Sequence, residues 1–172
     1  MTMTMKKLFY MASILMVAAL TLTACGGDDE PQTTATATYT LTFSPDLLDA
    51  CSVLIYYKSD NGDNSFDPIK TTRWTKVVTS DRFPAEFGVK YKFGVKPNSE
   101  LNKETYNLSF DVNFSIKNSK GDTFNKSVTI IEPVEVDRDH VKEVLERYDN
   151  QSIGYRYSIN GIPSEANNMD YD

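Results

Sequence analysis

The stretch Tyr106-Asn-Leu-Ser-Phe-Asp-Val-Asn-Phe-Ser-Ile116 has an apolar side chain at every even-numbered position and a polar one at every odd-numbered position. Because successive side chains of a β-strand point to opposite faces, this alternation predicts a long strand with one face in a core and the other in water. The same period of two recurs around Tyr39, Tyr91 and Tyr155. The chain is therefore expected to be mostly β.

Further strands and turns lie between these segments. The run Ser52–Tyr57 is apolar almost throughout, which favours a central strand, and β-branched residues mark strands at 70–79 and 123–131. Turn-forming residues separate the strands, as in Asn118-Ser-Lys-Gly-Asp122. Short strands joined by frequent turns favour an antiparallel, immunoglobulin-like two-sheet sandwich.

One segment near the C-terminus departs from the β pattern. Val141, Val144, Leu145 and Tyr148 are spaced at i, i+3, i+4 and i+7, with charged residues between them. This spacing predicts one short amphipathic helix. We expect Asp137 or Asp139 to cap it, and the helix to cover an open end or an edge of the sheets.

The alternative fold is a small lipocalin-like barrel. A run of strands, then a helix, then a last strand loosely resembles the order of elements in lipocalins. That resemblance implies eight barrel strands and an early Gly-x-Trp. The single tryptophan of this chain is Trp74, in mid-chain, so the sandwich is the preferred prediction.

The N-terminus has the composition of a secretory signal peptide. Lys6 and Lys7 precede an apolar run that ends at Leu22-Thr23-Ala24-Cys25. A retained membrane helix needs ~20 apolar residues, and this run is shorter. A second alternative is cleavage before a Cys25 that stays free or pairs with Cys51.

The four residues Leu22-Thr23-Ala24-Cys25 resemble the lipobox of bacterial lipoproteins. The resemblance implies that residues 1–24 are removed and that Cys25 becomes the lipidated N-terminus, so that the covalent lipid binds the membrane. The acidic cluster Asp28-Asp29-Glu30 resembles the export signal of Bacteroidota surface lipoproteins. It implies an outer-membrane protein displayed at the cell surface, with a periplasm-facing position as the alternative.

These boundaries predict the domain organisation. Residues 25–37 contain no large apolar side chain and are expected to form a flexible tether. Residues 38–160 form a single β-rich domain, and the polar tail 161–172 is expected to fray.

Charge and residue counts limit the function. The chain carries a net charge of −6, which disfavours nucleic acid as a partner. Its one histidine, His140, is expected to be exposed at the start of the helix. Cys51 is expected to be a buried apolar residue. No phosphate loop, HExxH or Cys-x-x-Cys motif occurs, so we expect no enzymatic activity.

Two sets of residues are candidates for binding. Asp60, Asp63 and Asp67 offer the hard oxygen ligands that Ca²⁺ prefers, although aspartate and asparagine are also common in turns. No other cofactor is expected. The aromatic candidates for a ligand-binding surface are Trp74, Tyr56 and Tyr57, of which Trp74 is also suited to the core.

The leading functional prediction is a lipid-anchored, non-enzymatic binding or accessory module of the cell envelope that contacts a glycan or a protein. The first alternative is a carrier of a small apolar ligand, which requires a large internal cavity. The second is a carboxylate-based hydrolase, which requires two acidic groups ~5–9 Å apart across a cleft.

Overall fold

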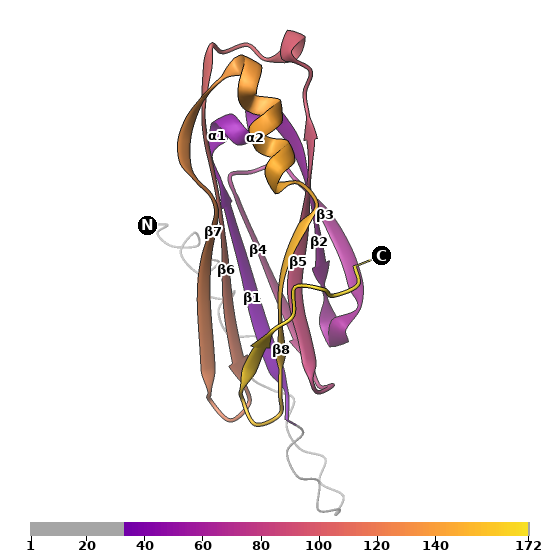
Figure 1. Ribbon diagram of the computed structural model, residues 1–172. Coiled ribbons are helices and arrows are strands. Elements are labelled where there is room, and N and C mark those ends of the chain that lie inside the picture. The colour runs from indigo at the N-terminus through magenta and orange to yellow at the C-terminus, as the bar shows by residue number, and fades with distance from the viewer. Residues whose placement is uncertain (1–32, 172) are drawn as a thin grey trace, which may run out of the picture. The chain divides into compact units, whose positions relative to one another are not determined.

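The structure is a computed structural model that describes residues 33–171 (Figure 1). Within that range the chain forms nine strands and two α-helices. In chain order they are β1 Ala35–Phe43, α1 Pro45–Ala50, β2 Cys51–Lys58, β3 Asn64–Ile69, β4 Arg73–Ser80, β5 Ala85–Val95, β6 Thr105–Asn118, β7 Thr123–Asp137, α2 Val141–Tyr148, β8 Gln151–Tyr157 and β9 Pro163–Glu165. The signal peptide (1–24), Cys25 and the tether up to residue 32 lie outside the described residues.

The strands form two antiparallel sheets. Sheet A has the order β4-β1-β6-β7, and sheet B has the order β3-β2-β5-β8-β9. The two sheets pack face to face and do not close on each other, which confirms the predicted sandwich and makes the lipocalin-like barrel wrong. Within residues 33–171, neither helix combines the length and the apolar content needed to cross a bilayer.

The alternating stretch 106–116 lies within β6, in the interior of sheet A between β1 and β7. Its even-numbered side chains are buried, as predicted, and face sheet B. Phe110 makes an edge-to-face contact with Tyr91 of sheet B, with ring centroids 4.9 Å apart. Phe114 meets Tyr39 and Tyr155 in the same way, at 5.5 and 5.2 Å. Aromatic side chains of both sheets therefore fill the core.

The first strand begins earlier than predicted. Ala35 and Ala37 are fully buried in β1, and the backbone of Thr34 bonds to Ser119 in the loop between β6 and β7. The predicted tether of residues 25–37 is therefore wrong for its last residues. Alternating alanine and threonine also has a period of two, and the small alanine side chains fit between the sheets.

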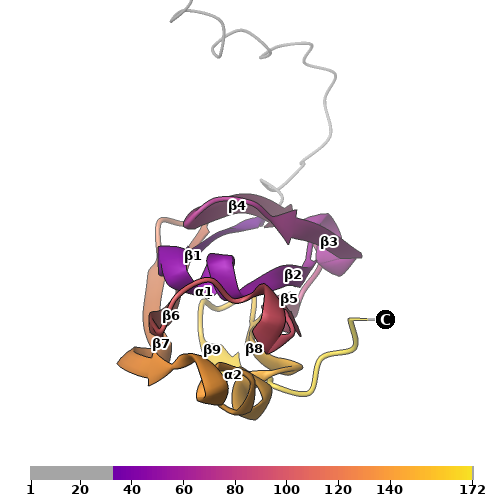
Figure 2. The ribbon, with the colours of Figure 1, turned by 90° about the horizontal axis from the view of Figure 1, so that it is seen from above.

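Both helices lie at the same end of the sandwich (Figures 1 and 2), and each contacts strands of both sheets. In α2 the predicted stripe is confirmed, since Val141 and Leu145 are buried. The predicted cap is wrong, because neither Asp137 nor Asp139 makes a capping hydrogen bond. A 3₁₀ turn at Arg138–His140 leads directly into the helix and takes the place of a side-chain cap.

The C-terminal tail does not fray. Pro163–Glu165 pairs with β8, and Ala166, Met169 and Tyr171 beyond it are buried. The prediction of a frayed tail at 161–172 is thus wrong for the residues up to 171. The physical reason is that two glycines of sheet B, Gly88 and Gly154, leave room for the Tyr171 and Met169 side chains.

Candidate functional site

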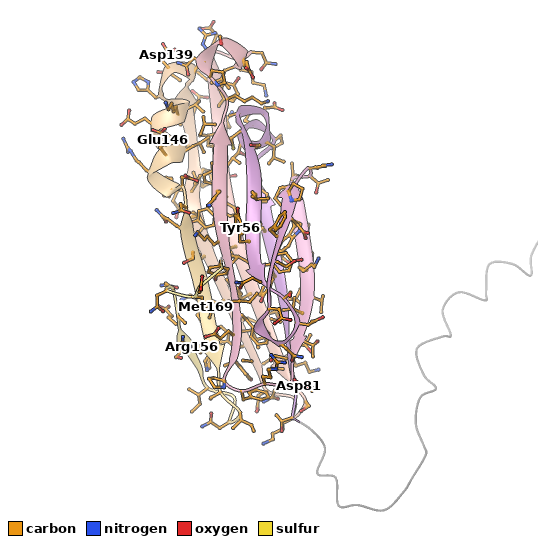
Figure 3. The ribbon with its side chains drawn as sticks, turned by 90° about the vertical axis from the view of Figure 1, so that its right-hand side faces the viewer. Tyr56, Asp81, Asp139, Glu146, Arg156 and Met169 are labelled. Atoms are coloured by element: carbon orange, nitrogen blue, oxygen red, sulfur yellow. The ribbon has the colours of Figure 1, made fainter. Side chains whose placement is uncertain are left out.

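Tyr56 and Tyr57 are neighbours on β2 and point to opposite faces of sheet B, as strand geometry requires. Tyr57 is only 2% exposed, and its ring packs between the sheets against Tyr39. It is therefore a core residue. Tyr56 lies on the outer face of sheet B (Figure 3) and is half-buried.

Trp74 is partly buried and packs against the core next to Tyr57. Its ring meets that of Tyr57 edge to face at 5.4 Å, and its indole Nε1–H donates to Oδ2 of Asp67 at 3.1 Å. Lys76 contacts the same carboxylate at 3.3 Å, and the Tyr57 side chain and then Asp67 raise the pKa of Lys76. The indole N–H thus joins β4 to β3, so the role of Trp74 is structural.

The three aspartates considered for Ca²⁺ do not converge. Asp60 accepts a hydrogen bond from the backbone N–H of Thr79 at 2.7 Å, while Asp67 is held by Trp74 and Lys76. Asp63 is exposed, at the end of a short 3₁₀ turn. In the part of the chain that the structure describes, no three His, Cys, Asp or Glu side chains gather in a way that could hold a metal ion.

The outer face of sheet B carries an aromatic pair that was not predicted from the sequence. Phe66 lies directly opposite Tyr56 in the β2–β3 pairing, and the ring centroids are 6.0 Å apart. The Phe66 side chain is 62% exposed. The only signal in the sequence was the large apolar Phe66 between polar Ser65 and Asp67, and the turn-like residues around it obscure a strand.

Two lysines border this pair on the neighbouring strand β5. Lys90 lies opposite Tyr56, and Lys92 lies opposite Leu54. The Lys92 ammonium is 5.0 Å from the centre of the Tyr56 ring, a cation–π distance. We call this surface the Tyr56 platform. It consists of Leu54, Tyr56, Phe66, Pro68, Lys90 and Lys92.

The C-terminal segment 163–171, here called the strap, borders the platform. Gly88 and Gly154 face each other across β5 and β8, and an added Cβ at Gly154 would lie 2.8 Å from Sδ of Met169. An added Cβ at Gly88 would overlap the Tyr171 hydroxyl. The two glycines therefore leave a notch that receives Met169 and Tyr171. Tyr56 packs against the same cluster, so the strap supports one side of the platform.

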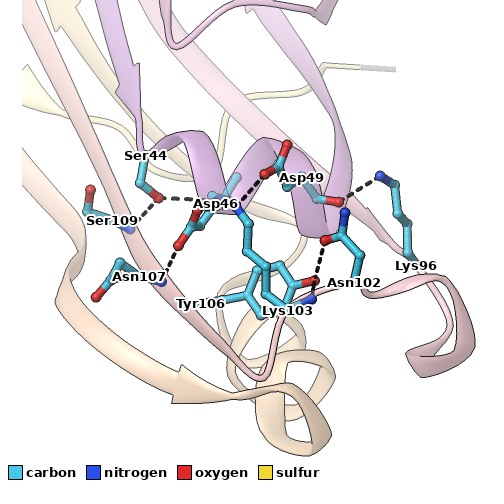
Figure 4. A network of polar contacts seen from close by, with 10 residues as sticks. Ser44, Asp46, Asp49, Lys96, Asn102, Lys103, Tyr106, Asn107 and Ser109 are labelled. Carbon is cyan, nitrogen blue, oxygen red and sulfur yellow. Dashed lines mark hydrogen bonds and ion pairs between the residues drawn. The ribbon is translucent and has the colours of Figure 1, made fainter.

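A polar network at the end of the sandwich that carries the two helices connects α1 to β6 (Figure 4). The Lys103 ammonium lies 2.7 Å from Asp46 and 2.6 Å from Asp49, and Asp46 also accepts from the backbone N–H of Asn107. The Lys103 hydrogen bond and then the Asn107 contact lower the pKa of Asp46. These residues satisfy one another, so the network is structural.

Two surface hollows are lined mainly by polar residues. One, of about 390 Å³, lies on the outer face of sheet A between Thr38, Asn113 and Asn125. The other, of about 300 Å³, lies next to α2 and includes Glu104, Asp137 and His140. His140 is exposed there, as predicted.

Cys51 is buried at the start of β2, as predicted, and its thiol donates to the carbonyl oxygen of Leu47 at 3.2 Å. Burial raises the pKa of this thiol to about 12. The thiol is therefore protonated at neutral pH and is not activated as a nucleophile.

Comparison with known proteins finds no matching family model, no matching curated protein and no matching solved structure.

Proposed function

We propose that this protein is a non-enzymatic binding module of the bacterial cell envelope, anchored to the outer membrane by lipid on Cys25 and displayed at the cell surface. The Tyr56 platform is its contact surface for a glycan or protein ligand. The support for the anchor is the Leu22-Thr23-Ala24-Cys25 sequence together with the acidic residues that follow it.

The observation that carries the binding function is the exposed aromatic pair. Phe66 and Tyr56 lie side by side on the outer face of sheet B, and most of the Phe66 side chain is exposed to water. Burying an aromatic ring from water contributes about 1.5–3 kcal/mol. A ligand that covers Phe66 recovers part of this free energy, and the adjoining lysines add polar contacts.

The other two functions have less support. A carrier needs an enclosed apolar cavity, whereas large side chains from both sheets occupy the interior, among them Tyr39, Tyr91, Phe110 and Phe114. A hydrolase needs paired carboxylates in a cleft. The hollow beside α2 does contain Glu104, but it is an open surface depression of polar residues.

The platform is tested with a glycan array and with capture of envelope proteins, using full-length protein in detergent. Phe66→Ala is compared with Val77→Ala, which shortens a 60% exposed side chain on the outer face of sheet A. We expect Phe66→Ala to weaken any ligand found for the wild-type protein at least fivefold, and Val77→Ala to leave it unchanged. A ligand that binds both variants equally well refutes the platform as the site.

The anchor is tested separately by Cys25→Ala. We expect the variant to leave the membrane fraction, because the single covalent lipid attachment is lost. A variant that stays with the membranes would show that the lipoprotein assignment is wrong.

A further inference from the structure

Positive charge gathers beside the aromatic pair of an otherwise acidic protein. The chain has a net charge of −6, so its overall field repels polyanions. Lys90 and Lys92 nevertheless lie two residues apart on one face of β5, about 7 Å apart along the strand. Neither lysine belongs to any of the ion pairs found within residues 33–171.

The sheet register brings the rings and the charges into one row. Phe66 of β3 lies opposite Tyr56 of β2, and Tyr56 lies opposite Lys90 of β5. Neighbouring strands are about 4.8 Å apart, so the row is about 10 Å long. Lys92 lies diagonally next to Tyr56, within cation–π distance of its ring. An apolar contact surface and two cations thus lie within the reach of a single elongated ligand.

A sugar ring of an acidic polysaccharide has matching chemistry. One face of a pyranose presents C–H groups, which pack against an aromatic ring, and its carboxylate or sulfate group pairs with an ammonium. We propose that the Tyr56 platform binds an anionic polysaccharide, whose sugar rings pack on Tyr56 and Phe66 and whose acid groups contact Lys90 and Lys92. This inference rests on the proposed binding function and adds the chemical class of the ligand.

The size of the platform favours a glycan over an acidic protein. A stable protein–protein interface uses about 20–30 residues on each side. The platform has six residues, and the strap borders it on one side. A narrow polymer chain fits this area, and the repetition of its acid groups supplies several contacts along its length.

The test measures binding of full-length protein in detergent by affinity gel electrophoresis. The probes are polygalacturonate, its methyl ester, dextran sulfate and poly-glutamate. Polygalacturonate and its ester share the sugar ring and differ in charge. The double variant Lys90→Gln/Lys92→Gln is compared with Lys117→Gln/Lys126→Gln, which removes two exposed lysines of sheet A and changes the net charge equally.

We expect wild-type protein to bind polygalacturonate or dextran sulfate, and to bind the methyl ester at least tenfold more weakly than polygalacturonate. The Lys90/Lys92 variant should lose at least tenfold in affinity, and the sheet A variant less than twofold. Raising NaCl from about 50 mM to about 500 mM should weaken binding, because salt screens contacts between exposed charges.

Each contrary result has a distinct meaning. Failure of both anionic polysaccharides to bind, or equal binding of the methyl ester, overturns the anionic ligand and leaves the binding module standing. Equal or tighter binding of poly-glutamate that depends on the same lysines overturns the glycan class. Polysaccharide binding that Phe66→Ala does not weaken overturns the platform itself and with it the proposed function.

Discussion

The notch formed by Gly88 and Gly154 predicts a specific response to Gly88→Ala. The added methyl group would overlap the hydroxyl oxygen of Tyr171 and would lie 3.0 Å from both Cα of Gly154 and the carbonyl oxygen of Ile153. Backbone atoms on either side prevent a small adjustment, so Tyr171 must leave the notch. The strap should then detach from sheet B.

The magnitude follows from what the strap buries. Tyr171 is 4% exposed, and returning a buried aromatic side chain to water costs about 1.5–3 kcal/mol. We therefore expect Gly88→Ala to lower the free energy of unfolding by about 2 kcal/mol and Tm by about 6 °C. Urea denaturation measures the first quantity, and hydrogen exchange at the Ala166 N–H, which bonds to Gly154, reports strap release.

Two comparisons isolate the cause. Gly94→Ala lies on the same strand. Its methyl group would overlap only the Oγ of the exposed Ser52, which can rotate away, and would lie at an ordinary contact distance of 3.8 Å from the Ser52 carbonyl oxygen. Its cost should stay below about 0.5 kcal/mol. In a Tyr171→Phe background, the cost of Gly88→Ala should fall by about 1 kcal/mol, because the overlapping hydroxyl is gone. Equal costs for Gly88→Ala and Gly94→Ala, or unchanged exchange at Ala166, would refute the notch.

Three further predictions concern other parts of the sandwich. Since the pKa of Asp46 is lowered in the folded state, its contribution to stability is present above the unfolded pKa of about 3.9 and is lost as pH falls through the folded value. Urea midpoints of Asp46→Asn and wild type should thus differ most near about pH 6 and converge toward about pH 2; a constant difference would contradict this. Trp74→Phe should lower the free energy of unfolding by about 1 kcal/mol through loss of the hydrogen bond to Asp67, without weakening ligand binding at the platform; weaker binding in this variant would return Trp74 to the site. Cys51 should react with an aromatic disulfide reagent at pH ~8 many times more slowly in native protein than in urea, since burial raises its pKa; equal rates would show that the thiol is accessible.

Part of the candidate site was visible in the sequence. Tyr56 and Tyr57 could be assigned to opposite faces because the period of a strand is two. Which of the two faced water could not be derived, since that depends on where sheet A packs. Phe66, Lys90 and Lys92 were missed because their proximity to Tyr56 comes from the β3–β2–β5 register, which links positions far apart in the chain.

The sequence by itself determined the local conformations. The alternation at 106–116 requires a strand with one buried face, and the spacing of Val141 and Leu145 requires an amphipathic helix, because both periods follow from backbone geometry. Tertiary structure decided which surfaces remain in contact with water. The tail reads as polar, yet Met169 and Tyr171 are buried because Gly88 and Gly154, 66 positions apart, meet across two strands and leave room for them. This space exists because neither glycine has a side chain, and it forms only when β5 and β8 pair and bring the two glycines together.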